Sequence, residues 1–260
     1  MLLVTGAYYP EISAAGVQCR AVAAAIGARA KVSVLTTSVN AALAPVDTVD
    51  GVVVYRVHVD VRSRASKAMA SVRLVRRLLQ ANRTYDIIHV HGFSQKNVPV
   101  SLLARLLGKQ VVLTLHTAGQ DEPDVVRGSG AIAYWAFRSA DLVMSVSPHL
   151  LAQWRAANLP AGHLRLSPNG VDTTRFRPAD ADERRTLRES LGWPEAPPVI
   201  VFVGFFSRDK RPDVLFRAWR RLGEAGIRTR LAFVGAKQTG YYEIDESMAD
   251  SIRREAAAIG

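Results

Sequence analysis

The stretch from residue 86 to residue 115, DIIHVHGFSQKNVPVSLLARLLGKQVVLTL, indicates how this chain folds. It begins with a short apolar run at residues 86–90, continues with a helix-type run at residues 98–107, and ends with a second apolar run at residues 110–115. Two short strands joined by a helix form a βαβ unit, in which the strands lie parallel in one sheet. We therefore expect a parallel sheet covered by helices.

The same alternation extends in both directions from this unit. It predicts seven strands joined by crossover helices, which make a complete doubly wound α/β domain. A turn of the Pro-Asn-Gly type follows at Pro168, so we predict that the first domain spans residues 1–167. The other expected strands are residues 2–5, 31–36, 52–59, 141–145 and 164–167, and the other expected helices are residues 15–29, 65–82, 129–138 and 148–157.

Residues 168–260 repeat the alternation on a smaller scale. After a polar connection we expect helices at residues 183–191, 211–225 and 244–258 and strands at residues 199–203 and 230–234. A sheet of only two parallel strands leaves those strands poorly buried, because parallel sheets are normally larger and covered on both faces. We therefore expect an incomplete second domain and a chain that is a fragment.

The composition excludes several classes of protein. Of the 260 residues, 48% are hydrophobic and 22% are charged, which excludes intrinsic disorder and a coiled coil. The single cysteine, Cys19, excludes an internal disulfide framework and suits a reducing compartment. The first residues resemble no signal peptide, and no run of 18 apolar residues occurs. We expect a cytoplasmic chain.

The formal charge of +11 is concentrated in one stretch. Residues 56–83 hold eight basic side chains and one acidic side chain. Their pattern predicts a basic amphipathic helix, which is open to three interpretations: a solvated face, attachment to anionic lipid at the inner face of the membrane, or nucleic-acid binding. Nucleic acid is the least favoured partner, because such modules interleave aromatic with basic residues. The basic arc consists of Arg73, Arg76, Arg77 and Arg83, and the apolar arc of Val72, Leu74, Val75, Leu78 and Leu79.

Ligands of open α/β sheets bind beyond the carboxyl ends of the strands. Gly16 follows the first strand at the start of a helix, where a backbone N–H could approach a phosphate, although an ordinary strand-to-helix turn explains it equally well. The glycine-rich dinucleotide fingerprint and the P-loop are absent, which argues against a nicotinamide-dependent dehydrogenase and a Walker-type ATPase.

Histidines follow or end two of the expected strands. His89 and His91 point to one face of their strand but have no evident third ligand, so we predict no metal site. We expect His91 and Gly92 to line a cleft instead. His116 directly follows residues 111–115, where it is either a hydrogen-bonding group of the site or a structural histidine.

A cationic loop follows the expected strand at residues 199–203. It carries Arg208, Lys210 and Arg211, and Pro212 occupies the first turn of the next helix. A cationic loop that leads into a helix N-terminus suits a diphosphate, although solvated charges remain the alternative.

Taken together, these segments resemble the GT-B glycosyltransferases of the retaining group 1, or family 4-like, class. The resemblance spans nearly the whole chain in the expected order and implies two facing Rossmann-like domains. It rests on residues 9–12 (YPEI) with 15–16 (AG), 85–92 (YDIIHVHG), 111–116 (VVLTLH), 140–143 (ADLV) with 145–147 (SVS), 168–172 (PNGVD), and 202–204 (FVG) followed by Lys210.

The resemblance also implies an activity and roles for individual residues. It implies transfer of a sugar, with retention of configuration, from a nucleotide diphosphate sugar to an acceptor glycan, lipid or small molecule, without any cofactor. His116 would line the sugar-transfer site, Gly16 would approach the donor phosphates, and Lys210 would hold the diphosphate. His91, Gly92 and Asn169 would lie on the cleft or acceptor side.

Three features depart from the pattern of this class. Phe205 stands where an arginine is usual, and Arg208 is a candidate substitute. Ala15 replaces one of two paired glycines, and no two glutamates separated by seven residues occur after Lys210. We therefore expect little or no transferase activity from this chain as it stands, and a non-catalytic GT-B-like binding module is the alternative.

Overall fold

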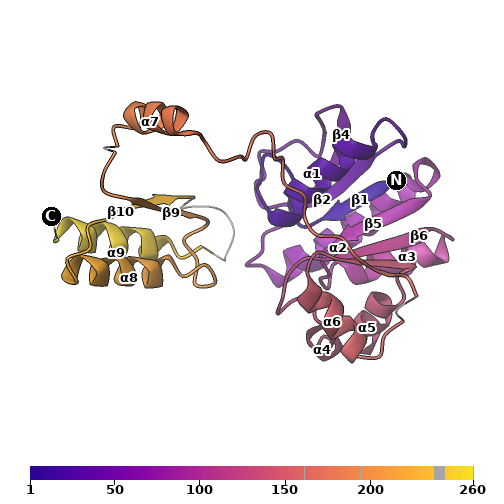
Figure 1. Cartoon of the computed structure of the whole chain (residues 1–260). Coiled ribbons are helices and arrows are strands. Elements are labelled where there is room, and N and C mark those ends of the chain that lie inside the picture. The colour runs from indigo at the N-terminus through magenta and orange to yellow at the C-terminus, as the bar shows by residue number, and fades with distance from the viewer. Residues whose placement is uncertain (161, 194, 237–243, 260) are drawn as a thin grey trace. The chain divides into compact units, whose positions relative to one another are not determined.

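A computed structural model of the chain describes residues 1–160, 162–193, 195–236 and 244–259 (Figure 1). The chain divides into two compact units, Met1–Gly170 and Val171–Gly260. The division lies three residues after the boundary that the sequence predicts at residue 167. No helix in the described ranges combines the length and the apolar character needed to cross a bilayer.

The first unit is built around one eight-stranded sheet with the strand order β3-β4-β2-β1-β5-β6-β7-β8. All neighbouring strands are parallel except β3 and β4, which are antiparallel. The strands are β1 (Leu2–Thr5), β2 (Ser33–Ser38), β3 (Val46–Val49), β4 (Val52–His58), β5 (Ile87–His91), β6 (Gln110–Leu115), β7 (Leu142–Ser145) and β8 (Leu164–Leu166). The helices are α1 (Ala14–Ile26), α2 (Arg64–Gln80), the 3-10 turn η1 (Asn82–Thr84), α3 (Asn97–Leu106), α4 (Pro123–Gly128), α5 (Ala131–Arg138) and α6 (Pro148–Ala156).

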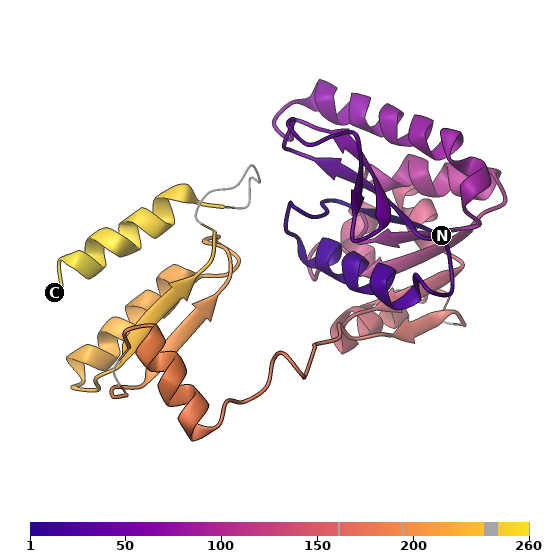
Figure 2. The ribbon, with the colours of Figure 1, turned by 90° about the horizontal axis from the view of Figure 1, so that it is seen from above.

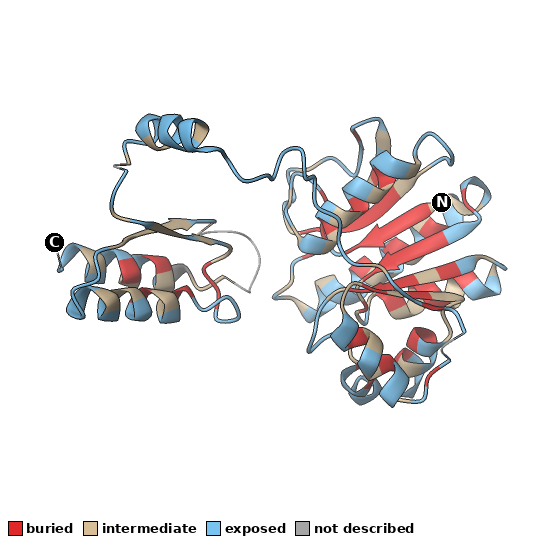
Figure 3. Ribbon diagram, viewed as in Figure 1, coloured by how far each residue is buried: buried red, intermediate tan, exposed pale blue. Residues whose placement is uncertain are grey.

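Helices cover both faces of this sheet, as the near-continuous apolar strands require. On one face, buried side chains of β1, β5 and β6 pack against α2, α3, α5 and α6, and Phe137 and Trp154 are fully buried there. On the other face, Leu3 and Val34 pack against Cys19 and Ala23 of α1. Figure 2 shows these layers from above, and Figure 3 shows that the central strands are largely buried.

The strand order reverses between β1 and β5. From β1 the chain moves outward through β2 to β4, and it then returns to β5 on the other side of β1. At such a reversal the loops that follow the two strands diverge, and ligands of open α/β sheets bind between them. We call the region beyond the carboxyl ends of β1 and β5 the crevice, and the candidate site lies there.

One strand was missed by the sequence prediction. β3 forms a hairpin with β4 through Asp50 and Gly51, which both have positive φ angles, of 50° and 78°. An Asp-Gly pair between two strands is the strongest short-range signal for such a tight turn, because both central positions of the turn need positive φ. Attention to Asp50-Gly51 would have found the strand.

One helix was missed, and one helix prediction needs correction. The helix expected at residues 129–138 is present as α5, but the short helix α4 before it was not predicted, and Gly130, with a φ of 109°, separates the two. The apolar arc predicted on α2 is also wrong in part: Leu74 and Leu78 are buried, whereas Val72 and Leu79 are 61% and 50% exposed. The buried face of α2 is therefore narrower than the predicted apolar arc, and it includes Ala70.

The second unit contains α7 (Ala181–Ser190), β9 (Val199–Val203), α8 (Pro212–Glu224), β10 (Arg230–Val234) and α9 (Glu246–Ala257). β9 and β10 are parallel, as expected, and form a two-stranded sheet. Phe216 of α8 and Ile252 of α9 pack with Phe206 and Phe233 on one face of this pair. The strands stay partly exposed (Figure 3), and Val203 has an exposed fraction of 77%.

Candidate functional site

The loop after β1 leads into α1 through a tight cap. Ser13 caps the helix, because its Oγ accepts a hydrogen bond from the Gly16 N–H at 3.0 Å and donates to the Ala7 carbonyl at 3.2 Å. A Cβ on Gly16 would lie 2.4 Å from the Ala7 oxygen, so only glycine fits there. This glycine therefore has a packing reason, and its predicted contact with donor phosphates would require its N–H to leave Ser13.

A chain of polar side chains crosses the crevice from α1 to β6. His91 Nδ1 lies 3.0 Å from Gln18 Oε1 and 3.2 Å from His116 Nε2. Gln18 Nε2 donates to Asn169 Oδ1 at 2.7 Å. The structure thus brings together three residues that the sequence singled out, His91, His116 and Asn169, through Gln18, which it did not.

This network fixes the protons on both imidazole rings. The Gln18 oxygen can only accept, so His91 Nδ1 carries the proton and donates it to Gln18 and, more weakly, to His116 Nε2. His116 Nε2 is then an acceptor, which places the proton of neutral His116 on Nδ1. His116 can therefore donate a hydrogen bond to a ligand through Nδ1.

Burial keeps the histidines of the cluster neutral. It lowers the pKa of His116 to about 4, and burial together with the neighbouring histidines lowers the pKa of His91 to about 2. His89 lies behind His91 with ring centroids 4.0 Å apart and bonds to Thr114 Oγ1 at 2.7 Å, and its pKa is lowered to about 4, chiefly by burial. At neutral pH the cluster therefore provides hydrogen bonds without charge.

Asp121 holds the two loops that carry the histidines. Its carboxylate accepts hydrogen bonds from the N–H of Phe93 at 2.6 Å, of His116 at 2.6 Å and of Thr117 at 2.9 Å. The residue is 1% exposed, and this burial raises its pKa against the lowering effect of the three N–H groups. Sequence reasoning missed Asp121, although an acid five residues after the strand-ending His116 was a visible signal.

A second polar group ties β1, β2 and α3 together beside the histidines. Lys96 Nζ donates to Thr37 Oγ1 at 2.8 Å, and Thr37 Oγ1 donates to the Gly6 carbonyl at 2.6 Å. Burial lowers the pKa of Lys96 to about 8, and the Glu11 carboxylate acts against this shift. Glu11 itself accepts from two backbone N–H groups of the loop after β2.

Several buried polar atoms of the crevice have no hydrogen-bond partner among the described residues. They include Glu11 Oε2, His91 Nε2 and Ser94 Oγ. Buried polar atoms are nearly always paired in folded proteins. Their gathering beyond the ends of β1 and β5 is typical of a place that a polar ligand completes.

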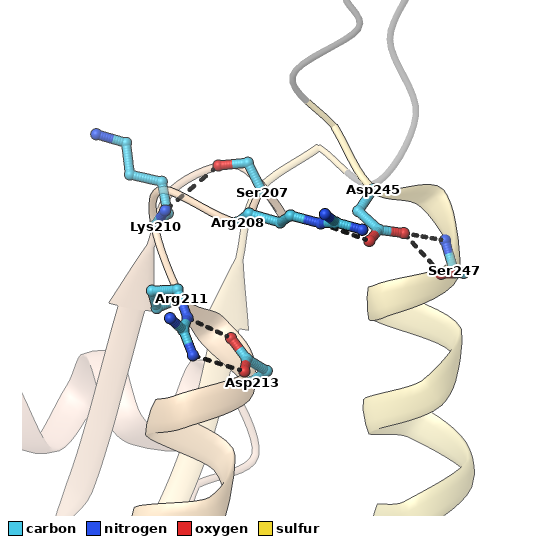
Figure 4. A network of polar contacts seen from close by, with 7 residues as sticks. All are labelled: Ser207, Arg208, Lys210, Arg211, Asp213, Asp245 and Ser247. Carbon is cyan, nitrogen blue, oxygen red and sulfur yellow. Dashed lines mark hydrogen bonds and ion pairs between the residues drawn. The ribbon is translucent and has the colours of Figure 1, made fainter. Parts of the chain in front are cut away.

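The cationic loop of the second unit lies between β9 and α8 (Figure 4). Arg208 Nε approaches Asp245 Oδ2 at 3.9 Å, and Arg211 Nε pairs with Asp213 Oδ1 at 3.2 Å. Lys210 has no ion pair within the part of the chain that the structure describes, and Figure 4 shows its side chain directed away from the other labelled residues. Its charge is thus open to a bound anion.

The predicted basic arc lies where the sequence placed it, with one exception. Arg73, Arg76 and Arg77 are on α2, whereas Arg83 belongs to the short turn η1.

Gly92 follows β5 with a φ of 73°, and His91 is buried beneath the half-buried His116 rather than facing solvent. Among the described residues, no group of three His, Cys, Asp or Glu side chains is placed to hold a metal ion.

Comparison with known proteins shows which family this chain belongs to. The sequence profile of Glycosyltransferase Family 4 matches residues 15–175, which is more than half of the chain. The chain belongs to this family. The resemblance predicted from the sequence is confirmed, and the matched residues include most of the crevice.

Two similar proteins are D-inositol 3-phosphate glycosyltransferases. The protein of Thermobifida fusca is 34% identical over 188 residues, which cover 65% of this chain and 42% of that protein. D-inositol 3-phosphate glycosyltransferase 1 of Catenulispora acidiphila is 31% identical over 174 residues, which cover 61% of this chain and 40% of that protein. The chain therefore spans less than half of the length of these relatives.

Solved structures confirm the predicted GT-B fold. Sucrose-phosphate synthase of Thermosynechococcus elongatus superposes with a TM-score of 0.75 at 19% identity, over 99% of this chain and 66% of that one. Anabaena HepE in complex with UDP and glucose superposes with a TM-score of 0.71 at 17% identity, over 100% of this chain and 66% of that one. At such identities the likeness concerns the fold.

Proposed function

We propose that this family 4 chain acts in the transfer of a sugar from a nucleotide diphosphate sugar to the hydroxyl group of an acceptor, with retention of configuration. The observation that carries the proposal is the neutral chain of hydrogen bonds from Asn169 through Gln18 and His91 to His116, at the crevice between β1 and β5. Relatives named as inositol phosphate glycosyltransferases and a neighbour bound to UDP and glucose support the substrate class.

In this proposal His116 binds the sugar that is transferred. Its pKa of about 4 keeps the ring uncharged at neutral pH, so it serves as a donor from Nδ1 and does not act as a general acid. The anomeric carbon loses its bond to the diphosphate oxygen, which keeps the electron pair, and gains a bond to the acceptor oxygen, whose proton leaves for the diphosphate. Asp121 positions His116 through its backbone N–H.

Lys210 is proposed to bind the diphosphate. Negative charge grows on that group as the glycosidic bond breaks, so a fixed cation stabilises the transition state more than the ground state. No cofactor is needed for this chemistry. Arg208 is proposed to assist in place of the usual arginine at Phe205, which would require its guanidinium to leave the long contact with Asp245.

The proposal is tested by calorimetric binding of UDP- and GDP-sugars to the 260-residue chain, followed by assays for transfer. Lys210→Ala should weaken the binding of the preferred nucleotide sugar by roughly tenfold, the effect of one charge-assisted hydrogen bond. Arg228→Ala removes the same charge at the opposite ends of the strands, next to β10, and should leave the affinity unchanged. Equal effects of the two changes would contradict a diphosphate site at Lys210.

His116 is tested by two substitutions that differ in a hydrogen-bond donor. Asparagine places its amide nitrogen near the position of Nδ1 and can still donate, whereas alanine cannot. The transfer rate of this chain is expected to be low, and His116→Ala should lower it further by on the order of 100-fold, His116→Asn by much less. If both variants lose the same amount, the donor role of Nδ1 is wrong.

A non-catalytic GT-B-like binding module is the second candidate, and Phe205 is the observation that favours it. A module of this kind would bind a nucleotide sugar without transferring the sugar. Release of nucleoside diphosphate above the uncatalysed rate, lost in His116→Ala, decides in favour of the enzyme. Tight binding with no such release decides in favour of the module.

We also propose a cytoplasmic chain that attaches through α2 to an anionic membrane surface. Met69, Val72, Arg76 and Leu79 lie at spacings that share one face of the helix, and the three apolar residues are 50% to 61% exposed. Exposed apolar side chains beside arginines are typical of helices that lie in the lipid headgroup region. Vesicles containing phosphatidylglycerol should retain the protein, and Val72→Ser with Leu79→Ser should release it. If added salt releases the protein from the vesicles and the two serine substitutions do not, insertion of this face is wrong.

A further inference from the structure

A cavity of about 540 Å³ lies between α2 and β4, away from the histidine cluster. Its size is in the range of sites that hold small molecules. Four guanidinium groups line it, and none of the described residues around it is acidic. The residues that matter for the argument are Arg56, His58, Arg73, Arg76, Arg77 and Gln80.

The elements bring these side chains to one place. Arg73, Arg76, Arg77 and Gln80 follow the spacing i, i+3, i+4 and i+7 on α2, so they share one helix face. Arg56 comes from β4, which lies opposite this face of the helix. The positive charges therefore converge on the cavity from two separate elements.

Asp47 pairs with Arg56, but the three arginines of α2 are not neutralised within the described ranges. No ion pair there involves Arg73, Arg76 or Arg77. Arg77 is instead held by the ring of Tyr55, 5.9 Å from its guanidinium carbon, and by Gln80 Oε1 at 3.5 Å. The guanidinium groups are thus left with donors that an anion can use.

Arg56 is the buried part of this site. Its side chain is 2% exposed, and it donates from one terminal nitrogen to Asp47 Oδ2 at 2.9 Å and from the other to the Tyr9 carbonyl at 2.8 Å. Its Nε is buried without a hydrogen-bond partner among the described residues. Buried donors are normally paired. Its contact with Tyr9 also links the cavity to the loop that follows β1.

We propose that this cavity binds an organic phosphate through Arg56, Arg73, Arg76 and Arg77. Guanidinium groups match the geometry of phosphate oxygens and bind them with two parallel hydrogen bonds. The phosphate belongs either to a lipid headgroup or to a soluble compound, and both present the same chemistry to the cavity. Binding of a phosphate in this cavity requires no sugar transfer, so its test is independent of the test of the proposed transferase activity.

The first experiment uses inorganic pyrophosphate as the probe, with calorimetry on the whole chain at physiological salt. The double substitution Arg73→Gln with Arg76→Gln should weaken binding at least tenfold, and both residues are exposed enough to be replaced without unfolding the protein. Arg83→Gln is the matched control, because it removes a charge from the adjoining turn but does not line the cavity. It should change the affinity by less than twofold.

The second experiment separates the two sources of phosphate. If pyrophosphate displaces the protein from vesicles that contain phosphatidic acid, the cavity takes lipid headgroups. If pyrophosphate binds but such vesicles do not compete, the ligand is a soluble phosphate. The proposal is overturned if pyrophosphate does not bind, or if the double substitution leaves its affinity unchanged, as binding at Lys210 alone would. It is also overturned if Arg83→Gln weakens binding as much as the double substitution does.

Discussion

Replacing Asp121 by asparagine should loosen the crevice where the histidines lie. The carboxylate accepts three backbone hydrogen bonds, from Phe93, His116 and Thr117, with donor distances of 2.6 to 2.9 Å. Asparagine has the same shape but offers one accepting oxygen and a nitrogen that donates. If the oxygen stays with His116 and Thr117, the nitrogen faces the N–H of Phe93.

The cost follows from these contacts. The bond to Phe93 is lost and its buried N–H remains unpaired, while the two other bonds change from charge-assisted to neutral. Hydrogen bonds to charged groups contribute about 1.5–3 kcal/mol and neutral ones about 1 kcal/mol. Relief from burying a charge, which raises the pKa of Asp121, offsets part of this loss. We expect the first unit to lose about 3 kcal/mol of its free energy of unfolding.

The measurement is hydrogen exchange of β5 and β6 amides in increasing urea, because two units make a single unfolding curve ambiguous. Asp124→Asn is the matched control, since that carboxylate is 83% exposed and pairs with Arg127 in solvent. The control should lie within about 0.5 kcal/mol of the unchanged protein. If Asp121→Asn is as mild as the control, the carboxylate does not hold the two loops together.

Three further changes test the packing and the titration of the first unit. Gly16→Ala should destabilise it by about 1–3 kcal/mol, although alanine favours helices, because the new Cβ would meet the Ala7 oxygen; an unchanged urea midpoint would refute that contact. The pKa of about 4 for His89 and for His116 lies below the 6.5 of a free imidazole, so between pH 6.5 and pH 4 the unfolded chain binds protons that the native chain does not. The free energy of unfolding should therefore fall on acidification, by about 2 kcal/mol for each histidine at pH 5, and a midpoint that stays constant from pH 7 to pH 5 would contradict their burial. Phe137→Ala should cost about 3–5 kcal/mol, measured by thermal unfolding, because this fully buried ring leaves a cavity in the core.

Much of the architecture could be predicted because it depends on short-range patterns. The apolar run of β6 and the helical run of α3 have periods that local sequence reveals directly. The Asp50-Gly51 pair is an equally local signal for a hairpin, but the strand before it was not predicted. The helix α4 was not predicted, because its six residues are too few to show a helical period.

The candidate site was predictable in its members but not in its connections. His91 and His116 follow from their places at strand ends, which the sequence shows. Gln18 lies within a helical run, and no pattern near it in the sequence predicts its contact with His91, 73 residues away. Asp121 similarly joins two loops whose proximity depends on the pairing of β5 with β6.

The sequence alone determined the alternation of strands and helices, the family, and the concentration of positive charge on α2, because these properties depend on residue types and their spacing. The tertiary structure decided which polar atoms meet and which charges stay unpaired. It placed Arg56, from a strand, opposite the arginines of α2 and turned a charged helix face into a cavity. It also buried the histidines, and burial, which no local pattern reports, is what keeps them neutral.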